Sequence, residues 1–166
     1  MPFKVFVIPL FFFLLFTGCK KPEEYPIIPE ISFKNISVQL QSNGKISLAA
    51  ITISFTDGDG DLGYKQAGLN DPIFDDTAST YYYNFIIRME ELINGVWVNN
   101  NANLSGRMPY LTPEGKNKNL KGDITMNVIS FPPSVVNKTI RYRIFIYDRA
   151  LHQSNTVYTD AIIINT

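Results

Sequence analysis

Residues 139–147 read TIRYRIFIY, and this stretch decides the fold class. Its branched and aromatic side chains recur at every second position, which is the period of a β-strand with one buried face. The residues that share this face are Ile140, Tyr142, Ile144 and Ile146. The stretch therefore predicts a strand that covers a hydrophobic core.

Outward from this strand, a period of two recurs along most of the chain and predicts further strands at residues 31–40, 46–55, 80–93, 96–98, 124–128 and 157–164. Asn94-Gly95 is a favoured type I′ pair and predicts a hairpin. Residues 99–122 are rich in Asn, Gly, Lys and Pro and predict an irregular connection, with a short strand possible at 107–111. No segment has a convincing helical period. We therefore expect an all-β fold, an immunoglobulin-like antiparallel β-sandwich of about seven strands.

The first 18 residues have the layout of a cleaved secretory signal. Lys4 precedes an apolar run at 5–16, and small residues follow it before Cys19. A membrane-spanning helix is the alternative, but it needs about 20 apolar residues, and Pro9 interrupts this shorter run. Residues 14–19, LLFTGC, resemble a bacterial lipobox, which implies that the mature chain begins at Cys19 and is held to a membrane by acyl chains on that residue.

Removal of residues 1–18 leaves 148 residues with 14 Lys+Arg against 15 Asp+Glu. A core of one domain can form at this length. No basic excess points to nucleic acid. Lipidation of Cys19, the one cysteine of the chain, leaves no thiol for a disulfide or a zinc site.

Three prolines stiffen residues 19–30 and predict an extended tether, so that the domain occupies residues 31–166. The tether begins with lysines followed by Glu23 and Glu24. This order resembles an export signal that sends some Bacteroidetes-type lipoproteins to the cell surface; a solvated linker is an equal alternative. We expect an outer-membrane location, facing either the periplasm or the surface.

Three pieces of the mature chain resemble uncharacterised Bacteroidetes-type lipoproteins with an immunoglobulin-like domain. They are the entry at 25–29, the loop FTDGDGDLG at 55–63, and the ending YDRA at 147–150 followed by Ser154-Asn155. The resemblance implies the fold and the cell-envelope location, and it implies no activity. The last loop of this group often has glycine where this chain has Leu151 or His152.

An acidic loop follows the second predicted strand. Six aspartates and one lysine lie between residues 57 and 76, and Asp57, Asp59 and Asp61 alternate with glycine. Alternate aspartates begin many calcium loops because Ca²⁺ takes six to eight oxygen ligands. The loop is not an EF-hand, since Leu62 stands where that motif has glycine.

The predicted topology brings a fourth carboxylate to this loop. In an immunoglobulin-like order, the loop after the second strand and the loop after the penultimate strand lie at the same end. We therefore predict that Asp148 completes a calcium site with Asp57, Asp59 and Asp61, beside the tether. The alternative is that these aspartates are turn formers whose carboxylates cap backbone donors.

Catalysis is not expected. His152 is the one histidine of the chain and falls in a predicted hairpin loop, and no nucleophile elbow, phosphate loop or dinucleotide fingerprint occurs. Trp97 and Tyr82 are candidates for stacking on sugar rings, with core packing as the alternative. Residues 76–78, DTA, match a short O-glycosylation pattern of periplasmic proteins in that bacterial group, which makes Thr77 a candidate acceptor.

These features favour a non-catalytic binding or structural module of the cell envelope, stabilised by calcium, with a protein or glycan partner at the cell surface. The alternatives are a surface carbohydrate-binding module and an accessory subunit of a glycan-uptake complex.

Overall fold

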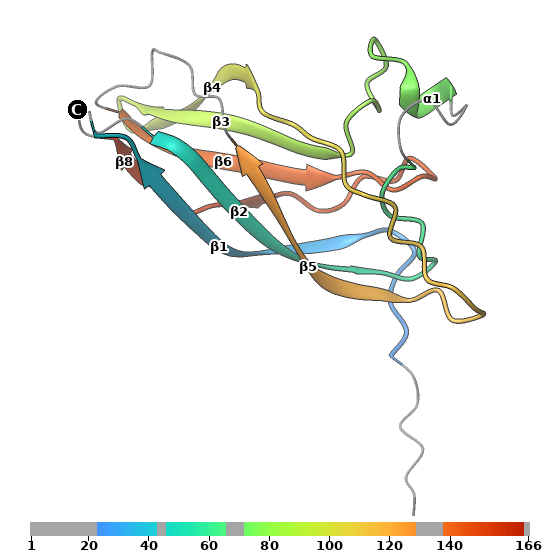
Figure 1. Cartoon of the computed structure of the whole chain (residues 1–166). Helices are drawn as coiled ribbons and strands as arrows, with labels where there is room; N and C mark the ends of the chain where they lie inside the picture. The colour runs from blue at the N-terminus through green and yellow to red at the C-terminus, as the bar shows by residue number, and fades with distance from the viewer. Residues whose placement is uncertain (1–22, 43–45, 66–71, 129–137, 165–166) are drawn as a thin grey trace, which may run out of the picture.

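The computed structural model describes residues 23–42, 46–65, 72–128 and 138–164 (Figure 1). The predicted signal at 1–18 and Cys19 lie outside these residues. The strands are β1 (Glu30–Leu40), β2 (Ile46–Asp57), β3 (Phe85–Ile93), β4 (Val96–Asn103), β5 (Leu120–Val128), β6 (Lys138–Ile146), β7 (Val157–Tyr158) and β8 (Ile162–Ile164). Within the described residues the one α-helix, α1 (Pro72–Asp75), has four residues, and no helix there is long and apolar enough to cross a membrane.

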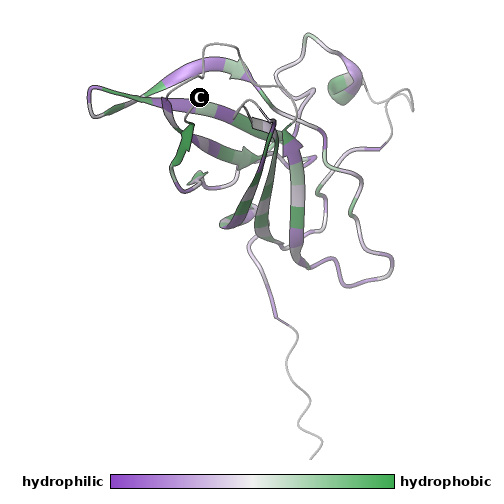
Figure 2. Cartoon of the chain, turned by 60° about the vertical axis from the view of Figure 1, so that its left-hand side comes forward, coloured by the Kyte–Doolittle hydropathy of each residue, from purple (hydrophilic) through white to green (hydrophobic). Residues whose placement is uncertain are grey.

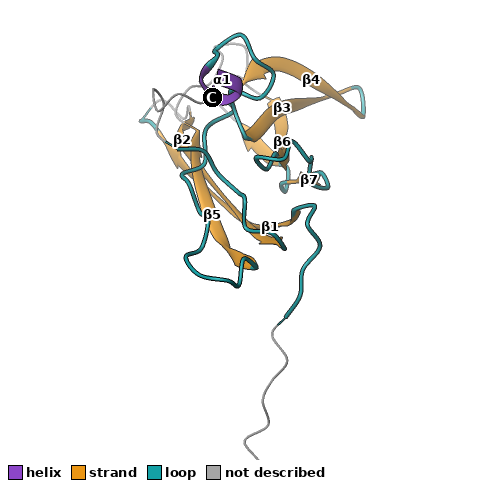
Figure 3. Ribbon diagram, turned by 90° about the vertical axis from the view of Figure 1, so that its right-hand side faces the viewer, coloured by secondary structure: helices purple, strands orange, loops and turns teal. Residues whose placement is uncertain are grey.

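The strands form two antiparallel sheets that pack face to face (Figure 3). One sheet has the order β1-β2-β5, and the other has the order β4-β3-β6-β7, with β8 also paired to β6. The chain crosses between the sheets after β2, after β4 and after β5. This arrangement confirms the predicted all-β, immunoglobulin-like sandwich.

The core lies between the sheets and follows from the alternation in sequence. Apolar and polar segments alternate along the strands (Figure 2). The large core side chains of β2, β3 and β6 that are fully buried face one another, and they are Ile51, Ile53, Phe85, Ile87, Met89, Ile140, Tyr142, Ile144 and Ile146. The period-two pattern of residues 139–147 therefore does mark the core face of β6.

Three predictions about local structure are wrong. The connection predicted as irregular at 99–122 is shorter, because β4 continues to Asn103 and β5 begins at Leu120. The strand predicted from residue 80 begins at Phe85, because the preceding residues form turns in which Tyr82 N–H donates to Ser79 O at 3.2 Å. The strand considered at 107–111 is reduced to isolated bridges, such as that between Tyr64 and Pro109. The helix α1, which no helical period predicted, lies in the same region at one end of the sandwich (Figure 1).

The pairing of the strands determines which loops meet. Glu30 pairs with Thr56, so β1 begins where β2 ends, and Phe85 pairs with Ile146, so β3 begins where β6 ends. Leu62, just after β2, forms a bridge with Asp148, just after β6. The acidic loop, the β6–β7 loop and the start of β1 therefore lie at one end of the molecule (Figure 1).

Candidate metal centre

The acidic loop turns tightly after β2. Asp57 is the last residue of the strand, and its Oδ2 accepts a hydrogen bond of 3.0 Å from the N–H of Asp61. Gly60 between them has φ 67°, a conformation that residues with a Cβ seldom adopt. The turn therefore brings the carboxyl group of Asp61, rather than that of Asp59, toward Asp57.

The β6–β7 loop supplies the third carboxylate. Asp148 is fully buried, and its Oδ1 accepts a hydrogen bond of 2.7 Å from the N–H of His152. Its Oδ2 lies 2.8 Å from Nδ1 of His152. The histidine is therefore half-buried and tied to Asp148, whereas its sequence context indicated only an exposed loop.

Leu151 lies inside this loop at φ 70°, in the left-handed region. Glycine reaches that region without steric cost. Leu151 therefore holds a conformation that glycine would adopt at lower cost.

The structure brings three of the four predicted ligands together. Asp57, Asp61 and Asp148 each offer a carboxylate oxygen, and these oxygens lie within 4.8 Å of one another. Two oxygens bound to one Ca²⁺ ion lie at most about 5 Å apart, because each Ca–O distance is 2.3–2.6 Å. The three side chains are thus close enough to share one calcium ion.

Two oxygens of this cluster have no hydrogen-bond partner within the described part of the chain. They are Oδ1 of Asp57 and Oδ1 of Asp61, and both atoms are buried. Asp57 as a whole is 0% exposed. A buried carboxylate oxygen without a donor or a cation is costly, so each of these atoms calls for a partner.

Burial and mutual repulsion act on the carboxyl groups. The pKa of Asp57 is raised to about 6, first by burial and then by the charges of Asp59, Asp61 and Asp148, against the hydrogen bond from Asp61 N–H. Burial and then the charge of Asp148 raise the pKa of Asp61. The hydrogen bond to Asp148 raises the pKa of His152, which holds a positive charge beside the cluster more readily.

Asp59 does not join the cluster. Its side chain is exposed, and it acts on Asp57 and Asp61 only through its charge. The prediction that alternate aspartates converge on one point is therefore wrong for this residue, because the turn at Gly60 breaks the alternation.

The chain that leads to the predicted anchor docks against the same loop. Gly58 N–H donates to Pro26 O at 2.8 Å, and a Cβ at Gly58 would lie 2.2 Å from Tyr25 O. Farther back, Asn119 Nδ2 donates to Glu23 O at 2.6 Å. The glycine is thus required for close contact, and it fixes residues 23–26 beside the carboxylate cluster.

The two aromatic candidates, Trp97 and Tyr82, do not form one site. Trp97 on β4 stacks on Arg141, with 4.4 Å between the guanidinium carbon and the ring centroid. Tyr82 packs against Arg107, at 5.0 Å, and against Tyr83. Each ring has a structural neighbour, and the two belong to different parts of the sandwich.

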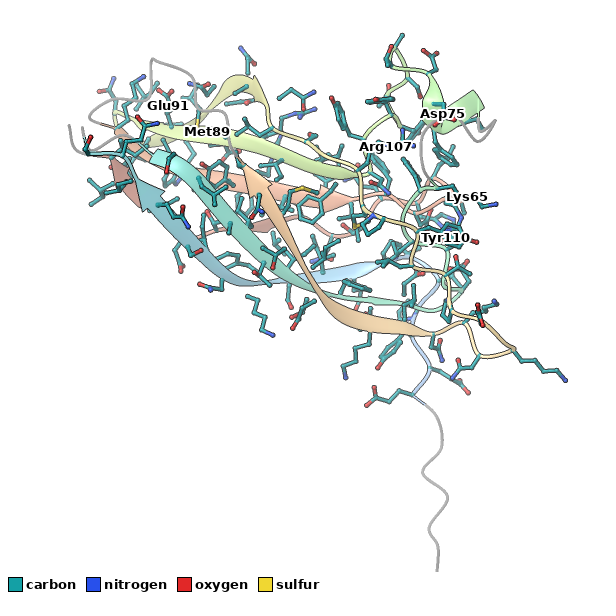
Figure 4. All side chains as sticks on the ribbon, in the orientation of Figure 1. Lys65, Asp75, Met89, Glu91, Arg107 and Tyr110 are labelled. Atoms are coloured by element: carbon teal, nitrogen blue, oxygen red, sulfur yellow. The ribbon has the colours of Figure 1, made fainter. Side chains whose placement is uncertain are left out.

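Arg107 has a structural role that sequence reasoning missed. It donates to the backbone oxygens of Phe74 and Tyr82 and to the carboxylate of Asp75, so it holds α1 against the domain. Figure 4 shows it beside Asp75, at the end of the molecule that carries Lys65 and Tyr110. Thr77 follows α1 and is exposed, as an acceptor for glycosylation must be.

Comparison with known proteins identifies no relative. No family model, no curated protein and no solved structure matches the chain.

Proposed function

We propose that this protein is a lipid-anchored module of the bacterial cell envelope, without catalytic activity, whose acidic loop binds one calcium ion. Asp57, Asp61 and Asp148 provide the ligands. Two observations carry the proposal. Among the described residues, a buried oxygen of Asp57 and one of Asp61 have no hydrogen-bond partner, and these two carboxylates and that of Asp148 each offer an oxygen within 4.8 Å of the others. A hard cation satisfies such oxygens and neutralises their repulsion.

The position of the cluster supports a role at the junction between tether and domain. Gly58, which contacts the tether at Pro26, follows directly after Asp57. An ion held by Asp57 and Asp61 fixes the two ends of this turn. Calcium then stiffens the connection between the anchor and the sandwich, and the protein acts as a structural or binding element with a partner at the cell surface.

Thermal melting tests this function. The full-length protein, solubilised in a mild non-ionic detergent, is melted in excess calcium and in chelator, with magnesium as a second cation. A ligand at 100 times its Kd adds about 2.7 kcal/mol to the free energy of unfolding, so calcium raises Tm by several degrees in a domain of this size. Melting curves that coincide in calcium and chelator would contradict the proposal.

The variant Asp57→Asn distinguishes a metal site from ordinary turn chemistry. This variant keeps an oxygen that accepts a hydrogen bond from Asp61 N–H, and it removes a buried charge. In chelator, its free energy of unfolding is therefore roughly 2 kcal/mol higher than that of the parent. Its Tm no longer responds to calcium. The matched control is Asp160→Asn, which removes an exposed carboxylate and leaves both measurements unchanged. If the aspartates only cap the turn, Asp57→Asn and the parent respond to calcium alike.

A further inference from the structure

The outer face of the β4-β3-β6-β7 sheet carries an unusual row of side chains. Across the four strands, Tyr158 is opposite Arg143, Arg143 is opposite Arg88, and Arg88 is opposite Asn103. The neighbours of these residues along β3 and β6, such as Ile87 and Ile144, face the core. The two arginines therefore lie side by side on the outer face, in the two central strands.

The arginine pair, Arg88 and Arg143, is only partly compensated in charge. Nη1 of Arg88 donates to Asn103 Oδ1 at 2.6 Å and to Ser105 Oγ at 2.8 Å, and no carboxylate of the described residues pairs with it. Nε of Arg143 forms a long ion pair with Glu90 Oε1 at 3.8 Å, and within the described part of the chain this buried nitrogen has no hydrogen-bond partner.

Glu90 is already engaged elsewhere, because Nε of Arg141 donates to its Oε2 at 2.8 Å. One carboxylate charge on this face is therefore shared between Arg141 and Arg143. Like charges directly opposite each other destabilise a sheet. Burial and then the charge of Arg143 lower the pKa of Arg88, which reflects the same unfavourable surroundings. A pair that weakens the fold in this way points to a ligand that compensates it.

The groups around the pair favour an anion carried on a sugar. Tyr158 borders the pair on one side and is 44% exposed, with the guanidinium group of Arg141 over one face of its ring at 4.1 Å. Phe145 and Tyr147 follow Arg143 on the same face of β6, and their rings pack edge to face at 5.6 Å. Aromatic rings offer apolar area to sugar rings, and paired guanidinium groups match carboxylate or sulfate oxygens.

An extended peptide is a poorer fit to this face. Arg88 lies on β3, which pairs with β4 on one side and with β6 on the other, so its backbone donors and acceptors are used within the sheet. Peptides that bind as added strands need a free sheet edge. A glycan needs only the side chains that this face provides.

We propose that the arginine pair, Arg88 and Arg143, binds the carboxylate or sulfate group of an acidic polysaccharide, with the neighbouring tyrosines against its sugar rings. This site lies on a sheet face and not at the carboxylate cluster, so it is independent of calcium.

Affinity electrophoresis of the full-length protein in detergent tests this site. The gels contain polygalacturonate, dextran sulfate, neutral dextran or polyglutamate, and all contain chelator, so that calcium cannot bridge protein and polymer. We expect retardation by polygalacturonate or dextran sulfate and none by neutral dextran. The double variant Arg88→Gln/Arg143→Gln loses about tenfold or more in affinity, because charge-assisted hydrogen bonds are removed. The control Lys34→Gln makes a single charge change of the same kind on the other sheet and keeps at least half of the retardation.

Three results would overturn the assignment. In the first, neither polygalacturonate nor dextran sulfate retards the parent protein. The second is equal retardation of the parent and the double variant, because the binding then lies elsewhere. The third is retardation by polyglutamate as strong as that by the polysaccharides, which would make the face a site for acidic proteins. Thermal melting of the double variant in chelator checks that it folds, and removal of the like-charge pair leaves its Tm equal to or above that of the parent.

Discussion

Tyr142 lies on the core face of β6, and its hydroxyl group is buried with no hydrogen-bond partner in the described part of the chain. Burial raises the pKa of this phenol. The folded state therefore keeps the proton at pH values where the unfolded chain loses it. Because the unfolded pKa is about 10, stability is complete below that pH and falls as the pH rises above it.

The substitution Tyr142→Phe removes this unsatisfied group. We expect the free energy of unfolding to rise by about 1 kcal/mol at neutral pH and the loss of stability above pH 10 to become smaller. Denaturant unfolding at pH 7 and pH 10.5 measures both effects. Tyr158→Phe, at an exposed position, is the control and changes neither value. A lower stability of Tyr142→Phe at pH 7 would mean that the hydroxyl has a partner after all.

At the residue scale, the sequence identifies candidates for the metal site but does not separate ligands from neighbours. Asp57 and Asp148 could be predicted, because the ends of the second and the penultimate strand meet in an immunoglobulin-like topology. Asp59 could not be excluded, because its exclusion depends on the positive φ of Gly60. The contact between Arg88 and Arg143 depends on strand register over many residues, and no local pattern carries that information.

Strand β1 shows how one side chain can complete an element. One edge of β1 pairs with β2. At the start of the other edge, Asn155 Oδ1 accepts a hydrogen bond from Ile31 N–H at 2.7 Å, and Asn155 Nδ2 donates to Ile31 O at 2.8 Å. The amide group thus satisfies the backbone of β1 as a neighbouring strand would. Similarly, Ser154 Oγ accepts a hydrogen bond from Ile146 N–H. These contacts explain why a Ser-Asn pair belongs to the last loop.

The substitution Asn155→Ala leaves both backbone groups of Ile31 without this partner. We expect the free energy of unfolding to fall by about 1–2 kcal/mol, and amide exchange at the start of β1 to become faster. Asn155→Asp keeps the acceptor and loses the donor, so its stability falls between the two. Chemical denaturation with hydrogen-exchange mass spectrometry gives both readouts. If Asn155→Ala and the parent are equally stable, another group satisfies the backbone N–H and C=O of Ile31.

At the element scale, the alternation of apolar residues predicts the core strands well. β2 and β6 each bury one face. That face can be predicted from the sequence, because alternate side chains of a strand point to the core and to the outer face of the sheet. The start of β3 was predicted too early, since Tyr81, Tyr82 and Tyr83 have strand-forming side chains. Their rings instead pack in turns, and Tyr82 stacks on Arg107, which is distant in sequence.

For the whole molecule, the proposed acyl anchor on Cys19 predicts where the protein acts. The lipobox resemblance at Cys19 predicts that Cys19→Ser abolishes acylation and moves the protein from the membrane fraction to the soluble fraction of the envelope. Fractionation followed by mass spectrometry of the N-terminal peptide measures this change. The same fraction for the variant and the parent would show that acyl chains on Cys19 do not hold the protein. Melting of the variant checks that its fold is unchanged.

The docking of Pro26 on Gly58 also sets the orientation of an anchored molecule. Pro26 lies seven positions after Cys19, and seven fully extended residues reach only ~25 Å. If acyl chains on Cys19 hold the protein as proposed, the carboxylate end would therefore face the lipid headgroups at close range. The β3–β4 hairpin turn lies at the opposite end of the sandwich (Figure 1). A strand as long as β2 spans roughly 40 Å. In the proposed anchored state, the hairpin is therefore the part of the domain farthest from the membrane, and its exposed apolar side chains are the first that a neighbouring molecule would contact. They are Leu92, Ile93, Val96 and Val98.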